Sequence, residues 1–299
     1  MPDGRVNHHL KGESCVHVVV TPCRDEVSLV RNLVKTMSKQ TVRPDSWVIV
    51  LHNYPDSSIR ELEEETLGSD WISLHRVDDN STRRRGAQIA RIVNFGISHF
   101  PQDWDFLSKI DSDVELPVDY FESILSEFSD SQDLGIASGS CYVLEGGRKI
   151  VEKVSDDHTR GALKTYRRQC FEDIGGIAEV NGWDGIDNIK AQMKGWTTKN
   201  FPQIQVKHSR RTGAYSGLLR GCFEAGQFSF SMRYYPPYIF ARSMHRMISK
   251  PIIIGGVSML AGYFHAYFSG HPSSCDKESI EYLRRKQKNR ISFWNRESH

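Results

Sequence analysis

Residues 106–117 read FLSKIDSDVELP, an apolar run followed by two aspartates one residue apart. Asp111 and Asp113 thus follow a segment with the character of a short buried strand. Their carboxylates are the hard oxygen ligands that divalent cations prefer, and such a cation could bridge to a diphosphate. The same Asp-Ser-Asp pattern also occurs as an ordinary polar turn, because Asp and Ser favour turns and helix caps. The surrounding sequence has to decide between the two.

Continuous apolar runs alternate with helical periodicity between residues 16 and 110. Strand-like runs occupy residues 16–20, 47–51 and 71–74, and a fourth run leads into Asp111. Apolar residues recur at helical spacing over residues 29–37, 59–67 and 85–100. This alternation predicts an α/β fold with a parallel sheet covered on both faces. Such sheets bind ligands at the carboxyl ends of their strands. Thr21, Pro22 and Asn53 follow the first two strands, so we expect them beside Asp111.

Composition narrows the function classes. The chain has 299 residues and a formal net charge of +2, which provides no general basic field for nucleic acid. Its six cysteines show no C-x-x-C spacing, so reduced thiols are expected instead of a zinc ribbon or a disulfide framework. Neither G-x-G-x-x-G nor a P-loop follows the first strand. A nucleotide would therefore be held through a metal.

Three regions are expected. Residues 1–14 are a polar tail without the apolar segment of a secretory signal, which predicts a protein at the cytoplasmic face. Residues 15–212 carry the strand and helix alternation and form the expected catalytic domain. Residues 213–299 form a helical, basic and aromatic region.

Several segments together resemble the inverting family-2 glycosyltransferases, which have the GT-A fold. In chain order they are VVVTP (18–22), WVIVLHN (47–53), RGAQIARIVNFGI (85–97), the Asp-Ser-Asp at 111–113, KTYRRQCFEDIGGI (164–177) and GWDGIDNIKAQMKGW (182–196). The resemblance covers about residues 15–210. It implies a mixed, mostly parallel sheet flanked by helices, with the C-terminal region as a helical extension.

The resemblance implies a metal-dependent hexosyltransferase that moves a sugar from a nucleoside-diphosphate sugar to an acceptor hydroxyl. Asp113 should coordinate Mg²⁺ or Mn²⁺, and Asp111 should contact the ribose or the metal through water. A third metal contact is expected at His208, which ends a strand-like segment. Both cations favour oxygen ligands and leave positions open for phosphate, so the residues do not choose between them.

The resemblance also implies contacts with the nucleotide. They are expected at Thr21, Pro22, Asn53 and Arg85. The family commonly ends its second strand with Asp-Asp or Asp-Asn, whereas this chain has His52-Asn53. A UDP-sugar remains the favoured donor, with GDP- and dTDP-sugars less excluded than usual.

Inversion requires a base that takes the proton of the acceptor hydroxyl. Alignment with the family's acidic helix gives Asp184 this role. Asp187 is the alternative, and its ordinary role would be a first-turn acid that suits the helix dipole. By resemblance, Arg167 and Arg168 are expected near the acceptor. Guanidinium groups suit diphosphate oxygens, so Arg210 and Arg211 are candidates there.

The C-terminal region suggests a lipid environment. Between Lys207 and Lys250 there are eight Lys or Arg residues and one acid, Glu224, with aromatic residues among them. Residues 251–268 then contain no charged side chain. We expect a helix that packs on the catalytic domain or lies in a membrane interface, although insertion is left open. A glycan or lipid-linked acceptor and peripheral membrane association would fit this pattern. Residues 276–299 are expected to form a charged helix.

Two other functions use similar residues. A nucleotidyltransferase also combines a parallel sheet, a metal and carboxylates, but its glycine- and lysine-rich phosphate loop is not found after the first strand. A membrane-bound scaffold could retain the fold without turnover. Such a scaffold would be expected to lack an acid, yet Asp111, Asp113 and Asp184 are all present.

Overall fold

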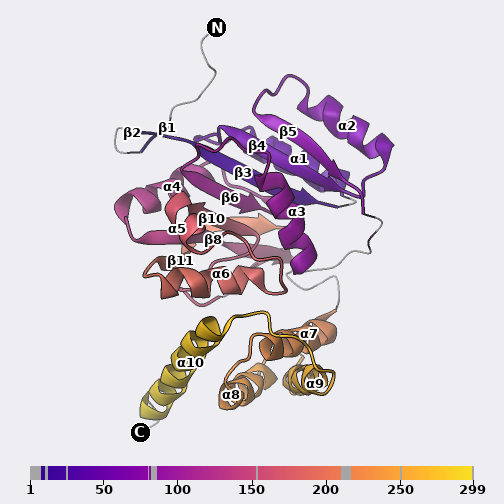
Figure 1. Cartoon of the computed structure of the whole chain (residues 1–299). Helices are drawn as coiled ribbons and strands as arrows, with labels where there is room; N and C mark the ends of the chain where they lie inside the picture. Colours follow the sequence, from indigo (N-terminus) through magenta and orange to yellow (C-terminus); the bar gives the residue numbers. More distant parts are fainter. Residues whose placement is uncertain are drawn as a thin grey trace. The chain divides into compact units, whose positions relative to one another are not determined.

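The computed structural model of the chain describes residues 8–297 except 11–12, 25, 80, 82–85, 153, 210–216 and 250. Two compact units make up the chain (Figure 1). The first, called the sheet unit here, consists of Met1–Glu179 and Trp183–Arg210. The second, the helical unit, consists of Val180–Gly182 and Arg211–His299.

Four parallel strands form one half of the main sheet, in the order β5-β4-β3-β6. They are β3 (His17–Cys23), β4 (Ser46–His52), β5 (Ile72–Val77) and β6 (Phe106–Ile110). All four coincide with the expected apolar runs. β3 extends past the expected end at Thr21, because it stays paired with β4 up to Cys23 although its pairing with β6 stops at Val20.

The other half of the sheet is mixed in direction. It comprises β7 (Val114–Glu115), β8 (Leu134–Glu145), β9 (Arg148–Val151), β10 (Leu163–Arg167) and β11 (Thr197–His208). β10 runs antiparallel to both β6 and β8, while β11 runs parallel to β8 and antiparallel to β7. A separate ribbon pairs β1 (His8–Leu10) with β2 (Glu13–Cys15).

Helices cover both faces of this sheet. One buried cluster joins it to α1 (Val27–Met37), α2 (Asp56–Thr66) and α4 (Tyr120–Asp130), and another joins it to α3 (Ala87–Ile97), α5 (Arg168–Asp173) and α6 (Trp183–Met193). The apolar spacing of α1, with Val30, Leu33 and Met37 buried, is the pattern of a helix packed on a sheet. The expected helix over 85–100 is shorter, and Arg85 lies outside the described residues.

The described residues of the helical unit form the helices α7 (Leu218–Ser231), α8 (Pro236–Met247), α9 (Ile254–Phe268) and α10 (Lys277–Glu297). α7 and α9 approach each other closely at glycines. A Cβ on Gly226 would lie 1.9 Å from the carbonyl oxygen of Met259, and one on Gly262 would lie 2.0 Å from that of Phe223. Among the described residues, no helix has both the length and the apolar character needed to cross a membrane.

Gly96 sets how closely α3 lies against the sheet. A Cβ at this position would be 2.5 Å from Val20 Cγ2 and 2.8 Å from Val50 Cγ2. Gly96→Ala should therefore lower the free energy of unfolding by about 1–3 kcal/mol, because overpacking outweighs the gain of about 1 kcal/mol in helix propensity. Urea unfolding followed by circular dichroism would measure it.

Gly185→Ala in α6 is the matched control, since the nearest atom to its Cβ would be 3.9 Å away. It should leave stability unchanged or raise it by up to about 1 kcal/mol. Equal effects of the two substitutions would contradict the close packing of α3.

Candidate active site

The carboxyl ends of β3, β4, β5 and β6 share one edge of the sheet because these strands are parallel. Asp111 follows β6 at this edge, and its backbone N–H donates to the carbonyl of Ala162 at 3.0 Å. The turn after β6 is thereby joined to the segment before β10. The Asp-Ser-Asp stretch therefore lies at the expected edge of the sheet, which is the edge where parallel sheets commonly bind ligands.

A buried lysine holds the first aspartate. Lys109 is 2% exposed, and its ammonium group forms an ion pair with Asp111 and donates to the carbonyl of Gly161 at 2.7 Å. A buried ammonium group requires such partners, since leaving it unpaired would cost several kcal/mol. Asp111 therefore has a fixed orientation at the strand end, with about a third of its side chain exposed.

Strand pairing brings His208 to the second aspartate. The two residues of β7, which directly follow Asp113, pair with the end of β11 so that Val114 lies opposite His208 and Glu115 opposite Lys207. As a result, His208 Nε2 lies 3.1 Å from Asp113 Oδ1. The two residues are 95 positions apart in the sequence. The structure therefore brings together these two residues, and their contact with a metal ion stays a prediction.

The surroundings of His208 fit a divalent cation. Two ligand atoms on adjacent octahedral positions of Mg²⁺ or Mn²⁺ are about 3 Å apart, given metal–oxygen distances of about 2.1 Å. The separation of Asp113 Oδ1 and His208 Nε2 matches this spacing. Burial alone would lower the pKa of His208, but its contacts with Asp113 and Glu152 raise it to about 9. A cation that bound here would therefore displace a proton from the imidazole ring and take the place of that proton beside the carboxylates.

A second group of donors lies on the other side of the imidazole. Cys141, Glu152 and His208 offer ligand atoms within 4.8 Å of one another. Burial raises the pKa of the Cys141 thiol to about 12, so this sulfur stays protonated near neutral pH and is a poor ligand. Glu152 is engaged by Arg160. Asp113 with His208 is therefore the better-suited pair.

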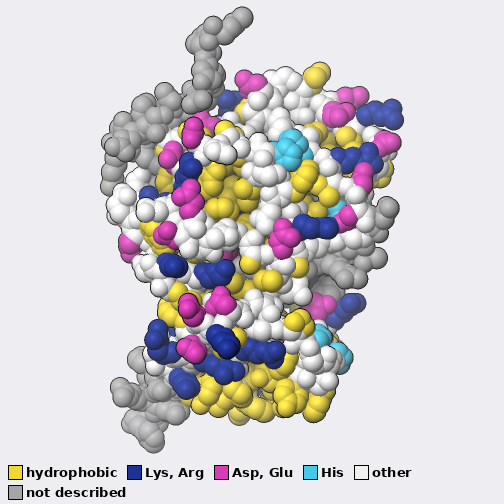
Figure 2. All heavy atoms as spheres, in the orientation of Figure 1, with side chains coloured by type: hydrophobic (Ala, Val, Ile, Leu, Met, Phe, Trp, Pro, Cys, Tyr) yellow, Lys and Arg dark blue, Asp and Glu magenta, His cyan; other side chains and the backbone are white. Residues whose placement is uncertain are grey.

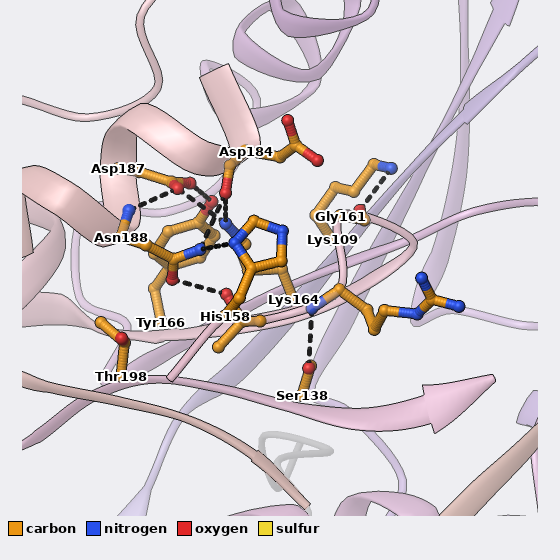
Figure 3. Close-up of polar contacts among 12 residues, drawn as sticks. Lys109, Ser138, His158, Gly161, Lys164, Tyr166, Asp184, Asp187, Asn188 and Thr198 are labelled. Carbon is orange, nitrogen blue, oxygen red and sulfur yellow. Dashed lines mark hydrogen bonds and ion pairs between the residues drawn. The ribbon is translucent and has the colours of Figure 1, made fainter. Parts of the chain in front are cut away.

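The N-terminal half of α6 presents two carboxylates in different environments, Asp184 in the first turn and Asp187 one turn later (Figure 3). Asp187 is buried; its Oδ1 accepts from Lys164 at 2.7 Å and its Oδ2 from the Tyr166 hydroxyl at 2.5 Å. Burial and the charge of Asp187 raise the pKa of Tyr166 well above its usual value. Asp187 is thus committed to holding the helix on β10.

Asp184 is partly exposed, and its carboxylate points away from the Asp187 cluster in Figure 3. Its backbone carbonyl accepts from Lys164 at 2.5 Å and from Asn188 at 2.9 Å. The backbone of this residue is therefore fixed. Within the described part of the chain, no hydrogen bond or ion pair to its carboxylate is found, which leaves this group free to accept a proton.

His158 is a residue that the sequence reasoning missed. Its Nδ1 lies 3.4 Å from Asn188 Nδ2, and burial followed by the charge of Lys164 lowers its pKa. The ring is therefore neutral near pH 7 and lies beside the start of α6. Nothing local in the sequence marks it, because its position depends on the pairing of distant segments.

The expected nucleotide contacts have mixed outcomes. Thr21 is fully buried, and its hydroxyl accepts a hydrogen bond from Trp47 Nε1 at 2.9 Å, so its side chain has a structural role. Pro22, at the same end of the strand, is partly exposed. The Asn53 amide donates to Asp79 at 3.2 Å and accepts from the backbone N–H of Asp79 at 3.0 Å. A contact of Pro22 or Asn53 with a nucleotide stays a prediction. Arg85, Arg210 and Arg211 lie outside the described residues.

Asp79 organises this loop and was also missed. Hydrogen bonds from Ser81 and His52 lower the pKa of its carboxyl group, and Arg91 forms an ion pair with it. The signal available in the sequence was the acidic pair at 78–79 after the third strand.

The expectation that Arg167 and Arg168 lie near the acceptor is wrong. β10 is antiparallel to β6, so Arg167 lies opposite Phe106, at the start of β6 and away from Asp111. Arg167 donates to the carbonyls of Leu134 and Phe128 at 3.0 and 2.8 Å, and Arg168 pairs with Glu172. Both arginines stabilise the far edge of the sheet.

Solved structures share this architecture. A mannosyltransferase, PcManGT from Pyrobaculum calidifontis in complex with GDP-Man and Mn²⁺, matches with a TM-score of 0.56 and 14% identity over 93% of this chain and 81% of that one. The chain has the GT-A fold. No protein-family model and no curated protein sequence matches it.

Two further structures agree with this GT-A assignment. GalNAc-T7 with UDP, GalNAc and Mn²⁺ matches at a TM-score of 0.53 and 15% identity, over 66% of this chain and 44% of that one. S. aureus TarS 1–349 matches with a TM-score of 0.51 and 13% sequence identity, over 86% of this chain and 72% of that one. The expected fold, including its flanking helices and helical C-terminal part, is confirmed.

The different environments of Asp184 and Asp187 can be tested by stability. Asp187→Asn should lower the free energy of unfolding by about 3–5 kcal/mol, because it leaves the buried ammonium group of Lys164 without its counter-charge. Asp184→Asn, the isosteric control on the same helix, should change it by less than about 1 kcal/mol. If urea unfolding gave the same loss of stability for both variants, the carboxylates of Asp184 and Asp187 would not differ in burial and pairing.

Proposed function

We propose that this protein is a metal-dependent inverting glycosyltransferase that uses a nucleoside-diphosphate sugar. The observation that carries the proposal is the pairing of Asp113 with His208 at the edge where Asp111 follows β6. The GT-A fold supports it, because the similar structures include complexes with GDP-Man and Mn²⁺ and with UDP and Mn²⁺. Asp113 and His208 would hold the cation.

The bound cation would supply positive charge where negative charge develops on the leaving diphosphate. Asp111, oriented by Lys109, is placed to meet the ribose or a metal-bound water. These residues alone do not distinguish Mg²⁺ from Mn²⁺. The complexes of the similar proteins make Mn²⁺ the first cation to test.

Asp184 is proposed as the base. Its carboxylate can accept the proton of an acceptor hydroxyl as that oxygen attacks the anomeric carbon from the face opposite the diphosphate, and attack from that face inverts the configuration. Asp187 cannot do this without breaking its contacts with Lys164 and Tyr166. We therefore retain one base candidate of the two expected.

The donor and acceptor are proposed by class. A UDP-sugar remains the favoured donor, and a GDP-sugar is the alternative that the mannosyltransferase complex supports. We propose that the acceptor is a glycan. A lipid-linked glycan would suit the apolar and basic C-terminal region. A nucleotidyltransferase is disfavoured by the missing phosphate loop, and a scaffold without turnover is disfavoured by the partly exposed carboxylate of Asp184.

Metal-dependent nucleotide binding is the first test. In thermal unfolding, UDP or GDP should raise the melting temperature only when Mn²⁺ or Mg²⁺ is added, and Asp113→Ala and His208→Ala should remove that metal-dependent shift. Asp70→Ala is the control, because this exposed residue precedes β5 at the opposite edge of the sheet. An unchanged shift in both site variants would refute the metal assignment.

Asp184→Asn should separate binding from chemistry. The variant should bind metal and nucleotide as the parent protein does but lose at least about 100-fold in transfer, because general-base catalysis contributes roughly 10²–10⁴-fold. Release of nucleotide from the sugar donor, with water as a slow substitute for the acceptor, would measure this. Normal turnover by Asp184→Asn would exclude it as the base.

A further inference from the structure

The helical unit exposes an apolar stripe along α9. Ile254, Val257, Phe264 and Phe268 are spaced by three, seven and four residues and are 58%, 51%, 41% and 80% exposed. The opposite side of the same helix carries Gly255, Met259, Gly262 and Ala266, all of them buried. α9 is therefore apolar on both sides, and only one side is covered.

A second stripe lies on α8 and continues the first. Phe240, Met244 and Ile248, at the end of α8, are 46%, 67% and 73% exposed. The ring centroids of Phe240 and Phe264 are 6.2 Å apart, so the two stripes join. We call these two stripes and the turn between them the apolar face.

The turn between the helices is strained and also apolar. Ile252 and Ile253 are 60% and 61% exposed, and Ile253 has φ 62° and ψ −59° with a 2.6 Å hydrogen bond from the N–H of Ile254 to the carbonyl of Ile252. This geometry is a γ-turn of the rare, strained kind, and a β-branched residue is unfavourable there. Such a residue persists where the surroundings impose it, and here it presents an isoleucine to solvent.

The two helices of the apolar face carry no acidic side chain, and α8 carries basic ones. The sequence has no Asp or Glu between Glu224 and Asp276, whereas Arg233, Arg242 and Arg246 lie in this interval. Figure 2 shows apolar side chains gathered over the helical unit with lysine and arginine side chains beside them. Exposed apolar patches of this kind mark interaction sites.

We infer that the apolar face binds the surface of an anionic lipid bilayer, with α8 and α9 in the interfacial plane and the Ile252–Ile253 turn inserted. Apolar side chains flanked by basic and aromatic ones match the boundary between acyl chains and anionic headgroups. A second copy of the chain fits less well, because a two-fold interface would bring the basic helix α8, with Arg242 and Arg246, toward the same helix of the other copy. Neither α8 nor α9 carries an acid that could pair with these arginines.

Flotation of the full chain with vesicles tests this inference without any nucleotide, so its outcome is independent of the proposed sugar transfer. The protein should bind vesicles of phosphatidylcholine and phosphatidylserine more tightly than phosphatidylcholine alone, and raised salt should weaken binding. The variant carrying Ile248→Gln and Phe268→Gln should bind roughly tenfold or more weakly, since two apolar side chains are lost from the contact.

The matched control carries Leu67→Gln and Leu144→Gln, which alter side chains of the sheet unit that are 86% and 54% exposed. It should bind vesicles as the parent does. Ile253→Gly is a second variant that preserves folding: glycine adopts a positive φ readily, so thermal stability should rise or stay equal while vesicle binding falls.

Three results would overturn the inference. The parent protein could fail to float with anionic vesicles, or the control could lose as much binding as the two face variants. In the third, sedimentation could show a dimer that Ile248→Gln with Phe268→Gln converts to monomers while vesicle binding is unchanged. That result would assign the apolar face to a second copy of the chain.

Discussion

Two buried lysines face each other across the antiparallel strands β6 and β10, and the candidate site depends on how their charges are neutralised. Lys109 and Lys164 are register partners and are 2% and 0% exposed. Like charges directly opposite in a sheet repel each other. Here each ammonium group has its own carboxylate, Asp111 for Lys109 and Asp187 for Lys164. Both ammonium groups also lie over the Trp183 ring, with its centroid 5.5 and 5.6 Å from the two nitrogens.

Each lysine also donates to a backbone carbonyl, and these bonds place the candidate groups. Lys109 reaches Gly161, in the loop before β10, and Lys164 reaches Asp184, at the start of α6. Lys164 holds Asp184 through its backbone carbonyl, so the carboxylate of Asp184 can still accept a proton. The carboxylate of Asp187, by contrast, already accepts hydrogen bonds from Lys164 and Tyr166. One pair of charges thus connects the turn that carries Asp111 with the helix that carries the proposed base. Either lysine without its acid would be a buried charge that costs several kcal/mol.

The sequence predicts the part of this architecture that local patterns determine. Apolar runs and helical spacing located β3, β4, β6 and α1, and the paired aspartates pointed to the ligand-binding edge. Strand direction cannot be read from local patterns, and this is why Arg167 was expected near the acceptor although β10 carries it to the far edge. Lys109 and Lys164 also interrupt the expected character of buried strands. Their burial follows from acids that lie on the adjoining turn and helix.

The position of His208 shows how far a single site residue can depend on distant backbone. β11 pairs in parallel with β8, but its register shifts between Phe201 and Gln205, where the partner advances only from Gly139 to Ser140. Gly139 permits this irregularity, because a Cβ there would lie 2.6 Å from the carbonyl oxygen of Ile204. Beyond the shift, Lys207 and His208 reach β7 in the register that sets the imidazole beside Asp113.

The ion pair between Lys207 and Glu115 cannot fix this register by itself, because both side chains are about one-third exposed and such pairs contribute about 1 kcal/mol or less. The two residues of β7 add few backbone hydrogen bonds. The longer pairing of β11 with β8 on both sides of the shift must therefore determine where β11 ends. A glycine in the adjoining strand is thus as necessary for the proposed metal-binding geometry as the histidine itself.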